Sequence, residues 1–283
     1  MIKPINTVRP SPIAGTWYSA DPEELRRTVD GYLENATLPD LPGEVVALVA
    51  PHAGYLYSGS VAGYAFKAIR GKAFKSVAVI SPMHQYTAHP ILTSAHRAYQ
   101  TPLGEIPVDH QQLSQISDAL QNKIGLSLSP IANDQEHSLE IELPFLQRAL
   151  TGDFNLIPIM LRDQTPAVAK ALGEVLGLFL ADSDSLLVAS SDLSHFLPEA
   201  TANLLDNRVL SALVDFSPEG LFDLKARGEG QACGLAAIAA VLWAARELGA
   251  EDVSLLNYDT SASTTGDRSS VVGYGAAAIT RPF

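Results

Sequence analysis

The sequence predicts a single α/β domain with a central, mostly parallel sheet flanked by helices. Residues 45–50 and 77–80 form continuous apolar runs, which are typical of strands buried on both faces. A helical pattern at 61–69 separates them, and strand, helix and strand in that order form a βαβ unit. The 283 residues are 47% hydrophobic and 18% charged, which suits one sizeable core. No Pro, Gly, Ser or charge-rich linker divides 1–283, so we expect one domain.

The first predicted helix begins near residue 21. Asp21 is a good N-cap residue, Pro22 suits a first helical position, and Glu24 is placed to complete a capping box. The apolar side chains that follow have the spacing of an amphipathic helix packed on a core. They are Leu25, Val29, Tyr32 and Leu33.

Each strand of the βαβ unit leads into a histidine. The run at 45–50 is followed by His52, after which a loop is expected, and the run at 77–80 is followed by His84. Parallel strands end at the same edge of a sheet, and we expect these two to be neighbours about 4.8 Å apart. His52 and His84 should therefore meet where open α/β sheets bind ligands.

The alternation of strands and helices continues along the chain. Apolar runs at 156–160 and 186–189 predict buried strands, and the second leads directly into the segment SSDLSH at 190–195. Helical patterns lie at 138–150, 166–181, 198–214 and 232–247. Further strands are predicted at 253–256 and 271–279, the last with glycines that indicate close packing or a bulge.

Charge and cysteine content restrict the partners and the compartment. The net charge is -12, and the 19 Lys and Arg residues are scattered, which argues against nucleic acid and anionic membrane as partners. The single cysteine excludes an internal disulfide, and no signal peptide is visible at the start, so a reducing cytoplasm is expected. The most apolar helical pattern, at 235–245, is too short to span a bilayer.

His52, His84 and Cys233 together form a candidate metal site. Neutral imidazole is the commonest side-chain metal ligand, and a thiolate is a strong soft one, so the three can leave an open coordination position. Cys233 precedes a predicted helix, whose N-terminus is expected to lower the thiol pKa. The alternative is that Cys233 is a small buried apolar residue.

Two further pairs are candidates for catalysis or for support of the ligands. Asp192 and His195 follow a predicted buried strand, and Glu136 and His137 precede a predicted helix. A histidine with a pKa near neutrality can donate or accept a proton, and a carboxylate can orient a ligand. Asp192 and Glu136 could equally serve as helix caps or interact with a helix dipole.

The remaining histidines give a weaker signal. His89, His96 and His110 lie in polar, loop-like sequence, and we interpret them as surface residues. Tyr55 and Tyr57 either line a pocket or anchor the packing of a loop. The sequence has no G-x-S-x-G, G-x-x-x-x-G-K-[ST] or H-E-x-x-H motif, which argues against serine hydrolases, P-loop enzymes and zincins.

Six ordered segments resemble the MEMO (mediator of cell motility) family over nearly the whole chain. They are AGTWY at 14–18, APHAGY at 50–55, TPLG at 101–104, QEHSLE at 135–140, SSDLSH at 190–195 and the pair Cys233-Gly234. The resemblance implies a fold like that of the class III extradiol dioxygenases, which cleave catechol rings with non-haem Fe(II). It also implies that microbial members accompany radical-SAM and AMMECR-type proteins.

The resemblance also implies roles for individual residues. His52 and His84 match the two metal-binding histidines, Cys233 matches the cysteine of the family, and His195 resembles the catalytic base of the ring-cleaving enzymes. Fe(II) is the expected metal, while a thiolate ligand also suits Cu or Zn. Three functions remain open at this point: an iron-dependent oxidoreductase on a small aromatic substrate, a non-catalytic peptide- or ligand-binding module using the same cleft, and a Zn-dependent hydrolase.

Overall fold

Four parallel strands form the centre of the fold and end at the candidate site. The structure is a computed structural model that describes residues 4–181 and 184–283. The central strands run in the spatial order β2-β9-β3-β8, and each neighbouring pair is parallel. Their bounds are β2 (Glu44–Ala50), β9 (Ser185–Ser190), β3 (Ser76–Pro82) and β8 (Asn155–Leu161).

Shorter and antiparallel strands extend this centre into a nine-stranded mixed sheet within the described residues. On one side β12 (Val271–Arg281) is antiparallel to β2, and both β11 (Asp252–Thr260) and β10 (His195–Leu197) are antiparallel to β12. On the other side β4 (Ile91–Ser94) is antiparallel to β8 and parallel to β7 (Ser129–Ile131). The sheet is therefore parallel at its centre, and an antiparallel strand pair flanks this centre on each side.

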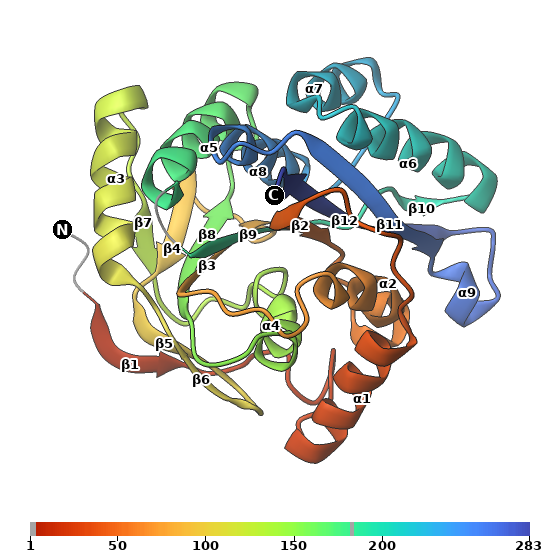
Figure 1. The fold of residues 1–283 in the computed structure, drawn as a ribbon, viewed down its shortest axis with the longest axis horizontal. Helices are drawn as coiled ribbons and strands as arrows, with labels where there is room; N and C mark the ends of the chain where they lie inside the picture. The colour runs from red at the N-terminus through yellow and green to blue at the C-terminus, as the bar shows by residue number, and fades with distance from the viewer. Residues whose placement is uncertain (1–3, 182–183) are drawn as a thin grey trace.

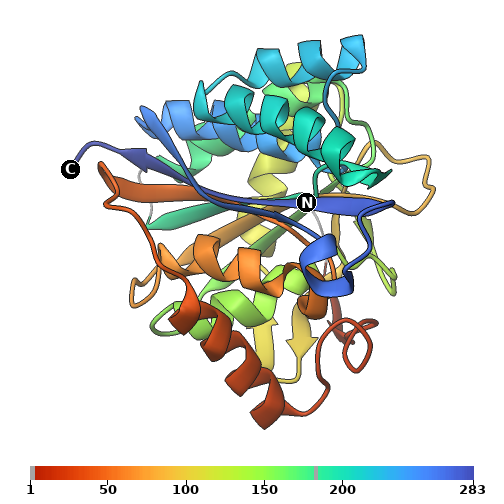
Figure 2. The same ribbon diagram turned by 90° about the vertical axis from the view of Figure 1, so that its right-hand side faces the viewer.

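Helices cover both faces of the large sheet (Figures 1 and 2). One face carries α1 (Pro22–Asn35), α2 (Tyr55–Lys67), the 3-10 helix η1 (Glu140–Glu142) and α4 (Leu143–Ala149). The opposite face carries α5 (Pro166–Leu180), α6 (Glu199–Val214), α7 (Pro218–Arg227) and α8 (Leu235–Glu247). The remaining helices are α3 (His110–Ile124), which packs on α5, and the short α9 (Ala262–Thr265).

Helix α8 is buried from Leu235 to Ala245 and packs closely on α5. A Cβ atom placed on Gly173 of α5 would lie 2.5 Å from the carbonyl oxygen of Ala240, so only glycine permits this contact. The residues 4–181 and 184–283 contain no helix that is long and apolar enough to cross a membrane.

The predicted start of α1 is confirmed. The Asp21 side chain accepts the backbone N–H of Glu24 at 2.7 Å. Glu24 does not close a reciprocal capping box, because its carboxylate accepts the hydroxyl of Ser19 at 2.6 Å. The buried face consists of Leu25, Val29 and Leu33.

Several expectations from the sequence are wrong in detail. β2 and β3 are parallel and end at the same edge, but they are not neighbours, because β9 lies between them. Helix α2 begins at Tyr55, so the expected loop is mostly helical. The helix expected at 138–150 is a 3-10 turn followed by the short α4.

A second sheet, unpredicted from the sequence, buries one of the expected surface histidines. It consists of β1 (Ile5–Arg9), β5 (His96–Thr101) and β6 (Gly104–Pro107). His96 is 2% exposed, its Nδ1 lies 2.8 Å from Thr7 Oγ1, and its Nε2 accepts the backbone N–H of Asn133. His96 is buried because it begins β5, which pairs with β1 on one side and with β6 on the other. His110 is half-buried, and His89 is exposed as expected.

Candidate metal centre

His52 lies immediately beyond β2 and is fully buried. Its backbone N–H donates to Asp192 Oδ1 at 2.7 Å, and its Nδ1 lies 2.8 Å from Ser190 Oγ at the end of β9. Burial, with additional repulsion from His137 and His84, lowers the pKa of His52 well below its usual value. The ring is therefore neutral, and one of its nitrogens keeps a lone pair.

His84 lies beyond β3 and is held by a single carboxylate. Its backbone N–H donates to Glu136 Oε2 at 2.6 Å, and its Nδ1 lies 2.9 Å from Glu136 Oε1. Burial alone would raise the pKa of Glu136, but hydrogen bonds from His84 and Ser138 bring it to about 2. An ionised carboxylate can only accept, so Nδ1 of His84 carries the hydrogen. This leaves Nε2 as the ring nitrogen that is available to a metal.

Cys233 brings its sulfur to the same place from the segment before α8. Its Sγ lies 3.0 Å from His52 Nε2 and accepts the backbone N–H of Asp192 at 3.2 Å. The backbone of Gly234 packs against β9, where a Cβ atom would lie 2.4 Å from the carbonyl oxygen of Ser190. Gln164 also donates to the carbonyl of Cys233 at 2.7 Å.

The expected low pKa of the Cys233 thiol is wrong for the protein without metal. Burial, together with the neighbouring carboxyl group of Asp192, raises the thiol pKa well above its usual value. Hydrogen bonds to the sulfur from Asp192, Ser191 and Gly234 oppose this change without outweighing it. A cation beside the sulfur would reverse it, because a coordinating thiol is deprotonated.

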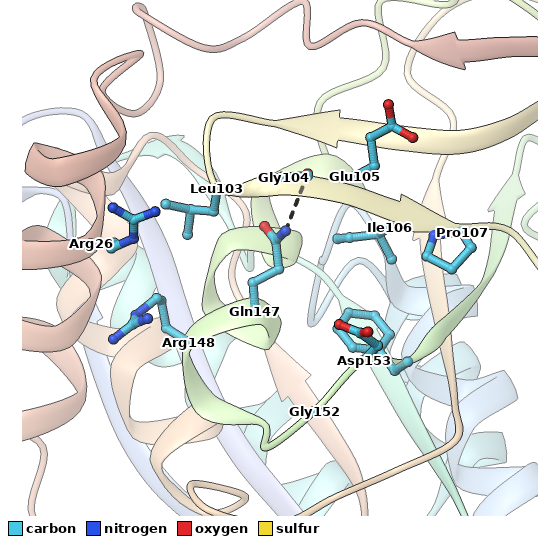
Figure 3. Close-up of a pocket in the computed structure, with 11 residues that line it drawn as sticks. Arg26, Leu103, Gly104, Glu105, Ile106, Pro107, Gln147, Arg148, Gly152 and Asp153 are labelled. Carbon is cyan, nitrogen blue, oxygen red and sulfur yellow. Dashed lines mark hydrogen bonds between the residues drawn. The ribbon is translucent and has the colours of Figure 1, made fainter.

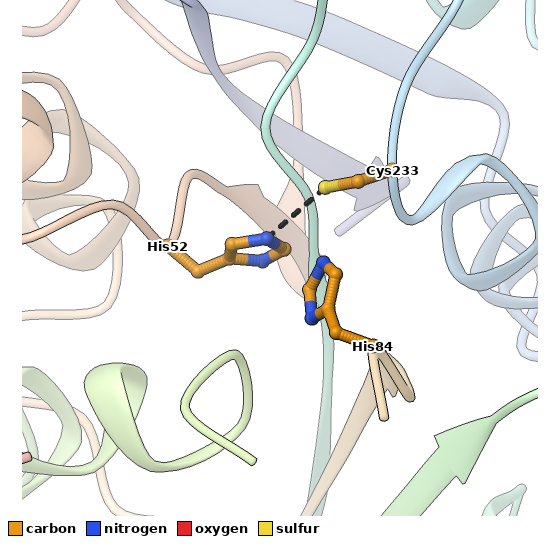
Figure 4. A group of neighbouring side chains, drawn as sticks. All are labelled: His52, His84 and Cys233. Carbon is orange, nitrogen blue, oxygen red and sulfur yellow. Dashed lines mark hydrogen bonds between the residues drawn. The ribbon is translucent and has the colours of Figure 1, made fainter. Parts of the chain in front are cut away.

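The three ligand atoms converge from separate segments of the chain (Figure 4). One nitrogen each of His52 and His84 and the sulfur of Cys233 all lie within 4.8 Å of one another. Metal–nitrogen bonds are about 2.0–2.1 Å long and metal–sulfur bonds about 2.3 Å. The ligand atoms of one ion must therefore lie about this close to one another. The donor set therefore fits one transition-metal ion. A second group, His84, Glu136 and His137, also meets this distance limit. There, however, the Glu136 carboxylate already accepts hydrogen bonds from the His84 ring and from the backbone N–H of His137.

Asp192 and Glu136 support the two histidines in equivalent ways. Each carboxylate accepts the backbone N–H of one histidine, His52 or His84. Burial raises the pKa of Asp192 to about 7, against the opposing effect of hydrogen bonds from the backbone of His52 and Ala53. Asp192 is not a helix cap, whereas Glu136 also accepts the backbone N–H groups of the two residues that follow it.

His137 lies in a stack of aromatic rings beside the proposed ligands. Its ring centroid is 4.2 Å from that of Trp17 and 4.8 Å from that of His84. Burial lowers the pKa of His137 to about 4, although Glu136 opposes this change. Trp17 was not anticipated as a site residue, although it lies within the AGTWY segment.

Arg9 fixes the segment that carries Glu136 and His137. It is 1% exposed, forms ion pairs with Asp134 and Glu140, and donates to the backbone carbonyl of Glu136 at 2.8 Å. A fully paired buried arginine is a rigid anchor. It therefore limits movement of the carboxylate that holds His84.

His195 lies beyond β9, on the same side of the sheet as the candidate ligands, but it is not one of the three that converge. Its Nδ1 lies 2.9 Å from the carbonyl oxygen of Leu193, which can only accept, so Nδ1 carries the hydrogen. Burial lowers the pKa of His195 below its usual value. The neutral ring thus presents Nε2 as a proton acceptor.

Large apolar side chains are exposed on the segments that follow the central strands. Leu56 and Tyr57 follow His52, Tyr86 follows His84, and Phe196 follows His195, with exposed fractions from 41% to 88%. Phe196 has a φ of 58°, in the left-handed region that non-glycine residues avoid. Strained residues of this kind cluster at functional sites.

We expect Phe196→Gly to leave the free energy of unfolding unchanged or to raise it by up to about 1 kcal/mol. The left-handed conformation costs a non-glycine residue about 1–2 kcal/mol, glycine in turn costs about 0.5–1 kcal/mol in entropy, and the exposed ring loses little burial. Urea denaturation measures the difference. Phe216→Gly is the matched control, because Phe216 has a φ of 52° but packs against the core. Equal destabilisation in both variants would contradict strain at Phe196.

A separate cavity lies near the start of β8, beside the β5–β6 hairpin of the small sheet (Figure 3). Its volume is about 420 Å³, and it lies between the β5–β6 hairpin, α1 and the segment that precedes β8. Its charged side chains are largely engaged elsewhere, since Arg148 binds Asp30 and Glu105 binds Arg97. None of the predicted site residues lines this cavity.

Comparisons with known proteins show which family the chain resembles. Residues 9–278 match the family model described as "Memo-like protein". A "MEMO1 family protein" of Ignicoccus hospitalis is 34% identical over 289 residues, covering 97% of this chain and 99% of the relative. One of Aquifex aeolicus is 33% identical over 267 residues, covering 94% and 97%.

The fold has a counterpart among solved structures. An uncharacterized protein of Escherichia coli K12 aligns with a TM-score of 0.53 at 17% identity, covering 82% of this chain and 99% of that protein. At this identity the likeness concerns the fold alone. The family model and the relatives above 30% identity extend over almost the whole sequence, so the chain belongs to the Memo-like protein family.

Proposed function

We propose that His52, His84 and Cys233 hold one metal ion, with Fe(II) as the resident metal, and that the protein is an oxidoreductase acting on a small aromatic substrate. The convergence of three ligand atoms from three separate segments carries this proposal. Two imidazoles and one thiolate leave coordination positions free. When bound, the ion supplies these positions for substrate and O₂.

The protein's own residues then orient the ligands and move a proton. Asp192 and Glu136 hold the backbone of His52 and His84, and the Nδ1 contacts of both rings direct the remaining nitrogens inward. His195 has a neutral ring with Nε2 free, so it acts as the base that accepts a proton from a substrate hydroxyl. The ring of Trp17, which contacts that of His137, offers an aromatic surface beside the proposed ligands.

Metal analysis of anaerobically purified protein tests the proposal. We expect about one iron ion per chain and O₂ consumption when catechols are added to protein loaded with Fe(II). Copper or zinc would be compatible with the thiolate ligand. Zinc together with hydrolytic activity would replace the oxidoreductase with a hydrolase, and an absence of bound metal would remove both.

A binding function is the second candidate. The exposed side chains of Leu56, Tyr57, Tyr86 and Phe196 on the segments after the central strands favour it, because exposed apolar surface is typical of ligand or peptide sites. This candidate gains if the protein binds aromatic ligands tightly and does not consume O₂. Calorimetric titration with catechols, with and without Fe(II), separates the two functions.

A further inference from the structure

A buried glutamate, Glu142, is connected to His52 through Ser190 and was given no role in the function proposed above. It ends η1, is 1% exposed, and its Oε1 lies 2.8 Å from Ser190 Oγ. Ser190 Oγ in turn lies 2.8 Å from His52 Nδ1. A continuous chain of hydrogen bonds therefore links this carboxyl group to a proposed ligand.

The hydroxyl of Ser190 has one hydrogen but three close partners. Its Oγ lies 2.5 Å from the backbone carbonyl oxygen of Ser138, which can only accept a hydrogen bond. The single hydroxyl hydrogen is therefore used there. The two remaining partners, His52 and Glu142, must both donate to Ser190 Oγ.

An ionised Glu142 does not satisfy the same contacts. It would compete with the Ser138 carbonyl for one hydrogen and leave an acceptor facing an acceptor at 2.5–2.8 Å in a buried place. Burial, reinforced by the carboxylate of Asp192, raises the pKa of Glu142 well above its usual value despite the contact with Ser190. Burial also raises the pKa of Glu140, but there an ion pair with Arg9 opposes the change and favours the ionised form.

We propose that Glu142 is a neutral carboxylic acid that donates to Ser190, and that Ser190 thereby holds His52 as the tautomer with hydrogen on Nδ1. This tautomer presents the lone pair of Nε2 towards Cys233 and the proposed metal. Glu142 is thus a positioning residue that acts through Ser190. Only the effect on metal affinity rests on the proposed function, because the protonation of Glu142 is a property of the metal-free fold.

Fe(II) titration under anaerobic conditions tests the positioning role. Glu142→Gln replaces the O–H donor with an amide N–H donor, whereas Glu142→Leu removes the donor at similar volume. We expect Glu142→Leu and Ser190→Ala to raise the Fe(II) dissociation constant by about 10- to 100-fold, and Glu142→Gln to restore most of this loss. Equal loss in the Gln and Leu variants would overturn the proposal.

Infrared spectroscopy of the metal-free protein tests the protonation state separately. We expect the spectrum of the parent minus that of Glu142→Gln to contain the carbonyl band of a protonated carboxylic acid at neutral pH. Glu140→Gln is the matched control and should remove an ionised carboxylate band instead. An ionised carboxylate band in the Glu142 difference would overturn the proposal. If the parent bound no Fe(II), the proposed function would fail, and the infrared result would still decide the state of Glu142.

Discussion

We expect His52→Ala and His84→Ala each to reduce bound metal from about one ion per chain to nearly none. Each change removes one of three proposed ligands that converge within 4.8 Å, and the two that remain would form an incomplete site. Loss of a supporting partner typically weakens metal binding by 10- to 100-fold, so loss of a ligand should exceed about 100-fold. Elemental analysis of anaerobically purified protein and Fe(II) titration measure the change.

His89→Ala is the matched control for these variants. His89 lies on the same segment after β3 as His84, but its Nδ1 contacts Ser129 Oγ, at 3.1 Å, and not the carboxylate of Glu136. Its replacement should leave the metal content at the parent's level. Metal retained by both His52→Ala and His84→Ala would refute the proposed ligand set.

The central part of the fold was predictable because its strands are buried on both faces. Continuous apolar runs identified β2, β3, β8 and β9, and parallel connection placed their carboxyl ends at one edge. The position of β9 between β2 and β3 was not predictable, because strand order depends on packing between distant segments. This order matters for the site, since it places Ser190 beside His52.

The second sheet was missed for a different physical reason. β1, β5 and β6 are short, and their exposed and buried positions alternate irregularly among polar residues, so they lack the apolar run of a central strand. Helix α2 was predicted to begin too late because Gly54, its N-cap residue, offers no side chain to cap the helix. Both errors concern segments without a strong local signal.

The residues of the candidate site also fall into those that the sequence predicts and those that it does not. His52, His84 and Cys233 stood out because each follows a strand or precedes a helix at the ligand-binding edge. Glu142 and Ser190 did not, because a hydrogen-bond chain between separate segments leaves no spacing pattern. The direction of the Cys233 pKa was predicted wrongly, because burial of the thiol is a property of the packed structure.

We expect His195→Ala to lower turnover by about 10²- to 10⁴-fold while metal content and folding stay near the parent's. Proton transfer by a positioned side chain typically contributes this factor, and the three proposed ligands remain in place. The neutral ring of His195, with Nδ1 bonded to the Leu193 carbonyl, is prepared to accept a proton at Nε2. Turnover of the catechol that the parent accepts best, measured with Fe(II)-loaded protein, gives the factor.

Asp192→Asn is the comparison that separates proton transfer from support. The side chain of Asp192 accepts the backbone N–H of His52, and its backbone N–H donates to the sulfur of Cys233. Replacing the side chain therefore affects a proposed ligand rather than the substrate. Its replacement should weaken Fe(II) binding by about 10- to 100-fold, whereas His195→Ala should not. Loss of metal in His195→Ala would make His195 a fourth ligand. Unchanged turnover with intact metal would show that the proton goes to another group, and the stacked, neutral His137 would then be the next residue to replace.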